Sequence, residues 1–192
     1  GTLGLALLLL PALTAAATPA PPRNAVNACP LGVAFGIFSV NYQRQVGGRH
    51  GVVARADYEA IPERFSEAAI DSHGYAFVLN YRWHIQEQMD SFFLGAYGRY
   101  RRFAGTGEID GKRFEFALPE MTVGANVGRR WLRENGLTMT FALGYGVSQG
   151  WRELSSLPRA NAEEAQSALD AFENEYAFAS PFLGEFSLGY AF

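Results

Sequence analysis

Residues 182–192, the last eleven of the chain, read FLGEFSLGYAF. In an extended strand, successive side chains point to opposite faces. One face of this stretch then carries large apolar side chains, namely Phe186, Leu188, Tyr190 and Phe192. The other face is small or polar, with Glu185, Ser187, Gly189 and Ala191. A soluble domain gives no reason for a strand to end on an apolar aromatic residue. The last strand of a closed sheet in lipid does, because it pairs with the first strand and keeps its apolar face outside.

The same alternation with a period of two recurs along the chain. It predicts strands at residues 31–43, 50–60, 73–85, 91–103, 113–130 and 137–149, and a final strand from about Tyr176 or Phe178 to the end. The clearest is 73–85, where one face carries Tyr75, Phe77, Leu79, Tyr81, Trp83 and Ile85. Six such residues suffice to cross an apolar band about 25 Å tall. Two irregularities are expected: a change of face near Phe38, explained by a bulge or a double-sided strand, and a break at Pro119.

The connections between these strands alternate in length. Residues 44–48, 86–90 and 131–136 form short turns, and residues 61–72, 104–112 and 150–175 form longer loops. Bacterial outer-membrane barrels have short periplasmic turns and longer external loops. The alternation therefore predicts a periplasmic carboxyl end. It also requires an eighth strand before residue 31, for which residues 22–30 are the only candidate, as a short or irregular strand.

Composition agrees with strands that are apolar at every second residue. Hydrophobic residues make up 48% of the chain, yet the mean hydropathy is close to zero. No run after residue 17 is long enough for a membrane helix, which needs about 20 apolar residues. The formal net charge of −3 gives no electrostatic case for binding nucleic acid. Cys29 is the only cysteine, so no intrachain disulfide is possible, and we interpret it as an incidental thiol.

The chain divides into three parts. Residues 1–17 form an apolar run that ends in three alanines, which predicts a secretory signal peptide. This segment lacks an initiator Met and a basic start, so we expect it to be truncated. Residues 18–30 are an N-terminal segment with a possible short first strand, and residues 31–192 are the expected barrel.

The last strand resembles the C-terminal assembly signal of bacterial outer-membrane β-barrels. The residues that carry the resemblance are Glu185, Ser187 (where glycine is usual), Tyr190 and Phe192. The mature chain also resembles the small bacterial outer-membrane β-barrel families, including uncharacterised ones whose first clear strands read like GVAFGIFSVNYQ, residues 32–43. The resemblance implies an all-β fold, an antiparallel up-and-down transmembrane β-barrel of eight strands. It implies a Gram-negative outer-membrane location, contact with membrane lipid and lipopolysaccharide, recognition by the barrel insertion machinery, and a monomeric state.

The alternative fold is a soluble lipocalin-like barrel that binds a ligand. The two folds exchange inside and outside, so the charged residues distinguish them. In a soluble barrel, Arg55, Asp57, Glu59 and Arg82 would face solvent.

In the membrane barrel, the polar faces point inward. They carry Arg55, Asp57, Glu59, Asn80, Arg82, His84, Arg99, Arg101, Glu120, Asn126 and Glu185. An eight-stranded barrel has an interior just wide enough for side chains to fill. Buried charges must be paired, so we expect an ion-pair network that closes the lumen. A path for a polar ligand or an ion is the alternative interpretation.

The sequence contains no recognisable catalytic motif. Some small outer-membrane barrels modify lipid A, and the deacylase type carries a His-x-Ser pair near its carboxyl end. None of His50, His73 and His84 is followed by that pattern. No P-loop, metal-ligand spacing or GxSxG motif is present, so we expect neither a catalytic residue nor a metal or other cofactor.

The expected role is structural or surface binding through the external loops, for an extracellular ligand that the sequence does not identify. Arg99, Arg101, Arg102, Lys112 and Arg113 bracket one of these loops. Guanidinium groups pair with phosphate, which makes Arg102, Lys112 and Arg113 candidates for contacts with lipopolysaccharide phosphates. Residues 159–175 have helix-forming composition, so they form either an external helix over the barrel or an acidic loop.

Overall fold

The computed structural model describes residues 21–34, 36–61, 71–109, 112–155, 167, 170 and 181–192. These residues form one antiparallel sheet with almost no helix. The elements are β1 (Asn24–Ala28), α1 (Pro30–Val33), β2 (Ile37–Gly47), β3 (His50–Ile61), β4 (Asp71–His84), β5 (Phe92–Ile109), β6 (Lys112–Leu132), β7 (Leu137–Gly150), β8 (Glu153–Ser155) and β9 (Phe182–Ala191). The expected signal segment, residues 1–17, lies outside the described residues.

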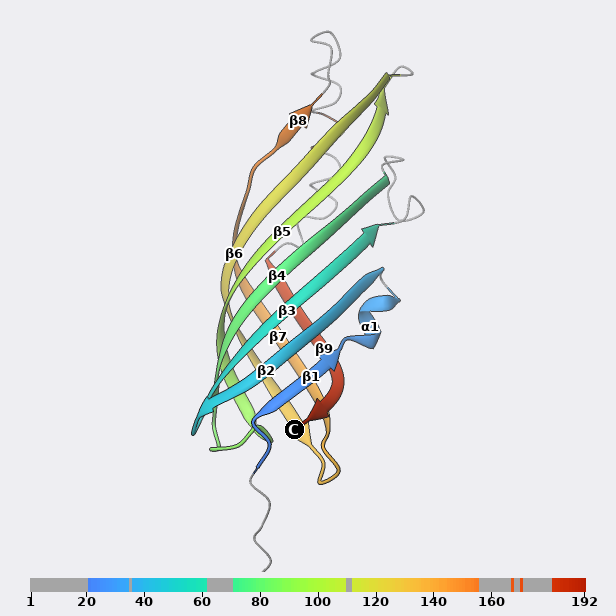
Figure 1. Cartoon of the computed structure of the whole chain (residues 1–192). Coiled ribbons are helices and arrows are strands. Elements are labelled where there is room, and N and C mark those ends of the chain that lie inside the picture. The colour runs from blue at the N-terminus through green and yellow to red at the C-terminus, as the bar shows by residue number, and fades with distance from the viewer. Residues whose placement is uncertain are drawn as a thin grey trace, which may run out of the picture.

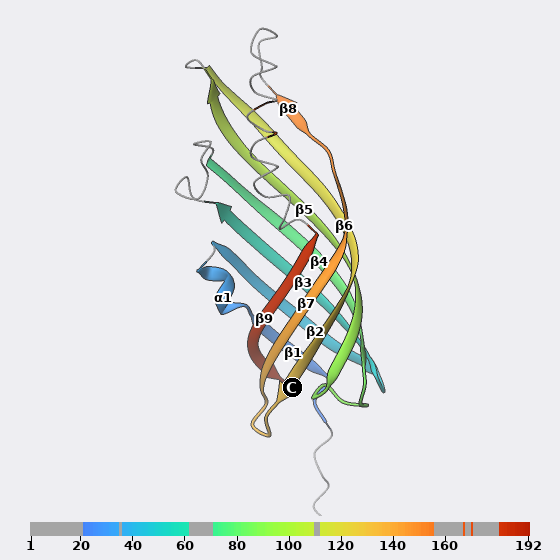
Figure 2. The same cartoon turned by 180° about the vertical axis from the view of Figure 1, so that it is seen from behind.

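Eight strands form a ring-like sheet, as Figures 1 and 2 show from opposite sides. Each strand from β1 to β6 pairs with the next, and β9 lies between β7 and β1. The short β8 pairs with β6 beyond the end of β7, so it continues the position of β7 in the ring. The sequence therefore predicted the all-β class and the eight antiparallel strands correctly.

The first strand is the short one. Within the candidate residues 22–30, the structure has a strand at Asn24–Ala28. Val26 pairs with Tyr42 of β2 on one side and with Tyr190 of β9 on the other. These pairings connect the beginning of the ring to its end. The last residue takes part as well, since the carbonyl oxygen of Phe192 accepts a hydrogen bond from the backbone N–H of Asn24 at 3.0 Å.

Side chains alternate between an exposed outer face and a buried inner face in the way the sequence predicts. On β4, Tyr75, Phe77, Leu79, Tyr81 and Trp83 are exposed, whereas the residues between them are buried. On β7, Thr138, Thr140 and Ala142 are buried, whereas Leu137, Phe141 and Leu143 are exposed. The outer face is consequently apolar, and the interior contains most of the polar side chains.

The change of face near Phe38 has a different cause from the expected bulge. Residues 30–33 form the short helix α1 rather than a strand, and β2 begins only at Ile37. Pro30 occupies the first turn of α1, where a missing backbone N–H costs nothing. The apparent switch is therefore the boundary between a helical turn and a strand that keeps one alternation throughout.

The break expected at Pro119 is also wrong. β6 continues through Pro119, which pairs with Arg102 of β5 without a shift in register. β7 pairs with β6 only as far as Glu120, and the carbonyl of Pro119 accepts a hydrogen bond from the backbone of Trp151 at 3.0 Å. Proline is tolerated because it lies just past the end of the neighbouring strand, where a missing ladder hydrogen bond matters least.

The Gly-rich segment 104–112, expected to be a loop, is mostly strand. β5 extends to Ile109 and β6 begins at Lys112, so the two strands form a long hairpin that reaches past the other strands (Figure 1). Continuous backbone pairing across this hairpin outweighs the weak strand propensity of its glycines. Residues 176–180, the expected start of the last strand, lie outside the described residues, and β9 is described from Phe182.

Candidate functional site: the polar interior

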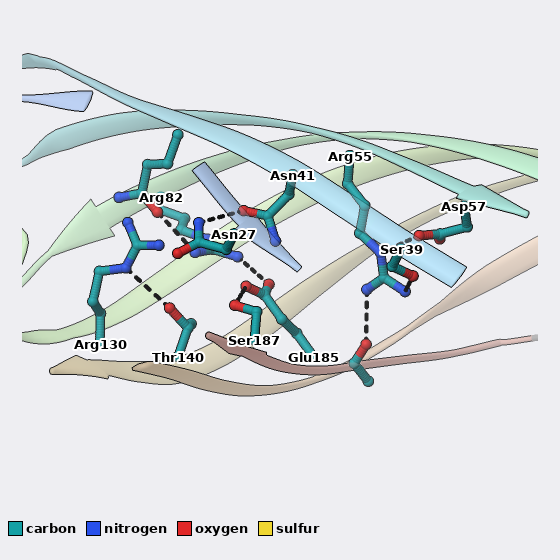
Figure 3. Close-up of polar contacts among 12 residues, drawn as sticks. Asn27, Ser39, Asn41, Arg55, Asp57, Arg82, Arg130, Thr140, Glu185 and Ser187 are labelled. Atoms are coloured by element: carbon teal, nitrogen blue, oxygen red, sulfur yellow. Dashed lines mark hydrogen bonds and ion pairs between the residues drawn. The ribbon is translucent and has the colours of Figure 1, made fainter. Parts of the chain in front are cut away.

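The interior of the ring is occupied by polar and charged side chains from the inner faces of most strands. Figure 3 shows the part in which Arg82, Glu185 and Arg130 approach one another from β4, β9 and β6. Burying a charge is costly unless it is paired and hydrogen-bonded. The partners of each charge therefore decide what this interior can do.

Arg82 and Glu185 form the central ion pair. The Arg82 side chain is 1% exposed and the Glu185 side chain 6% exposed. The hydroxyl of Ser187 donates to the second carboxylate oxygen of Glu185 at 2.9 Å, and Arg82 also donates to the amide oxygen of Gln43 at 2.9 Å. The guanidinium carbon lies 4.3 Å from the ring centre of Phe93, within cation–π range. This group joins the four strands β2, β4, β5 and β9.

His84 lies beside this pair and contacts a serine, an arrangement that resembles a catalytic pair. Its Nδ1 lies 2.9 Å from Ser91 Oγ, and its Nε2 lies 3.2 Å from Gln43 Nε2. Because the Gln43 amide oxygen accepts from Arg82, its nitrogen must donate to His84 Nε2, so the imidazole proton is on Nδ1. That proton points at Ser91 Oγ, whose own hydrogen is donated to the carbonyl of Phe92 at 2.9 Å. The histidine thus donates to the serine and does not serve as its base.

Arg130 is the interior charge that the sequence analysis missed. Arg130 is the last residue of the strand expected at 113–130 and adjoins the turn expected at 131–136, but in the structure it lies inside β6 and its side chain is fully buried. Nε donates to Thr140 Oγ1 at 2.9 Å, and one terminal nitrogen lies 3.8 Å from the sulfur of Met89. No carboxylate among the described residues lies within ion-pair distance of it, and its other terminal nitrogen has no hydrogen-bond partner. Continuing the alternation of Glu120 and Asn126 would have placed Arg130 on the inner face.

A second cluster lies towards the loop end of the ring. Arg55 Nε donates to a carboxylate oxygen of Asp57 at 2.6 Å, and Arg55 also donates to Ser39 Oγ at 3.2 Å. A terminal nitrogen of Arg55 reaches the backbone carbonyl of Gly184 on β9 at 2.8 Å. Arg55 therefore connects β3 to β9 on the inner side of the ring.

A third cluster contains two arginines and two glutamates. Arg99 and Arg101 both contact Glu120, at 3.1 and 3.4 Å, and Arg101 also lies 3.9 Å from Glu59. Arg99 further donates to Thr122 Oγ1 at 3.1 Å. The two arginines lie on β5, Glu120 lies on the neighbouring β6, and Glu59 lies on β3, so each guanidinium has a carboxylate beside it.

The two predicted asparagines do not join an ion pair. Asn80 and Asn126 are buried on either side of Gly95, and a Cβ added to Gly95 would lie 2.1 Å from Asn126 Oδ1 and 2.7 Å from Asn80 Oδ1. Glycine is required here because the two amide side chains already occupy the space. At this position the interior has no room for one more methyl group.

Several interior residues were not singled out from the sequence. The neutral ones include Asn27, Asn41, Gln43, Ser91, Thr122, Thr138 and Thr140, and Ser187 has a role as a hydrogen-bond donor that was not expected. Asn27 donates to Asn41 Oδ1 and accepts from Thr138, both at 2.7 Å, which places β1 in the same network. The alternation alone would have found most of them, whereas the search for charges did not.

The residues of the expected assembly signal divide between the two faces. Glu185 and Ser187 belong to the interior network, and Tyr190 and Phe192 are exposed on the outer face. The residues of the expected phosphate site are also separated. Arg99 and Arg101 point inward, and Arg102 is paired with Glu153 at 3.2 Å on the outside. The side chains of Lys112 and Arg113 lie outside the described part of the chain.

Neither a metal centre nor a membrane-spanning helix is found in the described part of the chain. No three His, Cys, Asp or Glu side chains there are grouped in a way that could hold a metal ion. No described helix is long and apolar enough to cross a membrane. Of the expected helix at 159–175, only Ser167 and Asp170 are described, both helical and exposed.

Comparison with known proteins found no match to a protein-family model, a curated protein or a solved structure. What can be inferred about function therefore depends on the geometry of this chain.

Proposed function

We propose that this chain is an integral β-barrel of the bacterial outer membrane that has a closed interior and no enzymatic activity. The observation that carries the proposal is the inverted distribution of polarity. Arg82, Arg130 and His84 are fully buried, whereas Leu79 is 62% exposed and Val147 is 77% exposed. A soluble protein rarely exposes a continuous apolar surface of this extent. The soluble lipocalin-like alternative requires the opposite arrangement.

The outer face has the layered composition of a surface in lipid. Exposed aromatic residues lie near both ends of the strands, with Tyr81, Trp83, Phe92, Trp131, Tyr190 and Phe192 at the turn end and Phe38, Tyr58, Tyr75, Tyr145 and Phe182 at the loop end. Aliphatic residues such as Leu79, Leu94 and Val127 lie between them. Aromatic girdles of this kind flank the apolar band of membrane barrels.

The height of the outer face also fits a membrane. Eight residue steps separate Tyr75 from Trp83, which corresponds to about 27 Å along the strand. With the strand tilt of about 40° that is usual in membrane barrels, this becomes about 20 Å along the axis, close to the apolar band of about 25 Å. Because membrane barrels have short periplasmic turns and longer external loops, we assign the turn end to the periplasm. The loop end, with the long β5–β6 hairpin, is then outside.

The filled interior favours a closed barrel over a pore. Three ion-pair clusters and the close contacts around Gly95 occupy the space within the ring. The described interior also offers no activated nucleophile, because Ser91 accepts from His84 and both are fully buried. These features support a structural role or surface binding through the external loops.

Three measurements test this proposal. The refolded protein should require detergent or lipid to remain dispersed; a protein that stays soluble without either would contradict the membrane assignment. Planar bilayers should show no steady conductance, and a stable opening in the nanosiemens range would refute the closed interior. Lipid A profiles from cells with and without the protein should be identical, and a changed acyl pattern would support the enzyme alternative.

A further inference from the structure

The ring wall has one place where a strand is missing. β1 ends at Ala28, so it covers β9 only from Leu188 to Ala191. Above this point, residues 182–187 of β9 pair with β7 on one side, and no described strand pairs with them on the other. The chain leaves β1 through Cys29 and forms α1, which contacts both β2 and β9 beside this gap (Figures 1 and 2).

A side chain closes the inner side of this gap. The hydrogen bond from Arg55 to the carbonyl of Gly184 satisfies a backbone acceptor on the uncovered edge of β9. Arg55 is held there by Asp57 and Ser39, so its positive charge is already neutralised (Figure 3). The Arg55 side chain thus covers the gap on the interior side, where no described strand pairs with this edge of β9.

Beside α1, on the side of β2 and β3, lies a crevice of about 490 Å³. Its walls are mainly apolar and include Val33 of α1, Phe38 and Val40 of β2, and Tyr58 of β3. Ser39 and Asp57, whose side chains are buried, also contribute to its lining. Among its lining residues, Phe38 is 53% exposed and Val40 is 58% exposed, which makes the crevice continuous with the apolar outer face.

We propose that this crevice binds one acyl chain of a membrane lipid. The inference depends on the proposed membrane location. The lining contains no unneutralised charge that would attract a lipid headgroup, because Asp57 is paired with Arg55. An uncharged apolar site that opens onto a lipid-facing surface is complementary to a hydrocarbon chain.

The helix α1 forms the outer lip of this site. None of its residues is buried, and Leu31 and Val33 are 57% and 51% exposed. An acyl chain between α1 and β2 would contact Val33 on one side and Val40 on the other. It would also separate the Arg55–Asp57 pair from the surrounding lipid.

The single cysteine provides a reporter at the base of the crevice. Cys29 lines it and is only 7% exposed, so annular lipid on the outer face does not reach it. The protein would be labelled at Cys29 with bimane while unfolded and refolded into dioleoylphosphatidylcholine vesicles that contain a small fraction of chain-labelled doxyl lipid. We expect the nitroxide chain to quench the bimane. Quenching by aqueous iodide instead, or no quenching by either agent, would overturn the inference.

A pair of substitutions distinguishes the crevice from general lipid contact. Ala56→Phe fills the crevice from β3 and should abolish quenching at Cys29. Ala125→Phe makes the same change on the exposed outer face of β6 and should leave quenching intact. Equal quenching in both variants would show that the doxyl chain reaches the label by another route, contrary to the proposal.

A second label separates this inference from the membrane assignment. In a Cys29→Ser background, Val127→Cys places bimane on the exposed outer face of β6. If this label is quenched and the Cys29 label is not, the crevice inference alone fails; if neither is quenched, the proposed membrane location fails. Should bimane at Cys29 prevent refolding, the label is moved to Val33→Cys in the same background. Loss of its quenching on Ala56→Phe then supports the proposal, and unchanged quenching refutes it.

Discussion

Replacing Glu185 with glutamine should cause the largest loss of stability of any single polar substitution in the group formed by Arg82, Glu185, Gln43 and Ser187. The change keeps the shape of the side chain but removes the carboxylate that faces Arg82, whose own side chain is 1% exposed. Breaking a buried ion pair by removing one partner costs about 3–5 kcal/mol, because an uncompensated charge stays behind. The upper part of this range is expected here. Arg130 is buried nearby, and no carboxylate of the described residues pairs with it, so among these residues Glu185→Gln leaves two unpaired guanidinium groups in one region.

The assay is reversible urea unfolding of the refolded protein in detergent, followed by tryptophan fluorescence. The matched control is Glu153→Gln, which breaks the Arg102–Glu153 pair at 3.2 Å on the exposed face, where the side chains are 34% and 53% exposed. Exposed pairs contribute about 0–1 kcal/mol, so the control should be nearly neutral. The double variant Arg82→Met with Glu185→Leu removes both charges and should recover much of the loss. Similar costs for Glu185→Gln and Glu153→Gln would refute the conclusion that the interior is dry and closed.

Three further predictions test separate parts of the structure. Deleting Phe192 should leave refolding in detergent intact, at a cost below the about 1.5–3 kcal/mol of a fully buried aromatic side chain, because Phe192 is 60% exposed. The same deletion should greatly reduce outer-membrane levels in cells, whereas Phe186→Ala, at a half-buried position, should cost at least as much packing energy with a milder assembly defect. Unchanged outer-membrane levels without Phe192 would show that the last residue is not a signal. Gly95→Ala should destabilise the fold by about 1–3 kcal/mol, because the new methyl group clashes with Asn80 and Asn126. The control Gly98→Ala should be tolerated, because nothing lies within 4 Å of its new methyl group. Equal urea midpoints for the two variants would contradict the packing around Gly95. Arg130→Met should raise the free energy of unfolding by about 1–4 kcal/mol, because it removes a buried charge that has no carboxylate partner among the described residues. A loss of stability would mean that a group outside the described residues compensates the charge of Arg130.

The sequence by itself determined the class of the fold and the face of nearly every strand residue. The reason is that a strand has a side-chain period of two, so a regular alternation such as that of residues 73–85 can be assigned to faces without knowledge of its neighbours. The same rule placed Arg82 and Glu185 together on the inner face. It could not pair them, because 103 residues separate the two in the chain and only the order of the strands around the ring brings β4 and β9 into reach.

The tertiary structure decided the features that depend on a neighbouring strand. Pro119 and the glycines near residue 105 have poor strand propensity, yet they lie in strands because β5 and β6 pair with each other along their whole length. Arg130 was missed because its position at the end of the expected strand, next to a turn, concealed its place in the alternation. The gap beside β1 was not visible in the sequence either. Whether a short strand leaves its neighbour uncovered depends on where the register of β1 against β9 ends, and that register is a property of the closed ring.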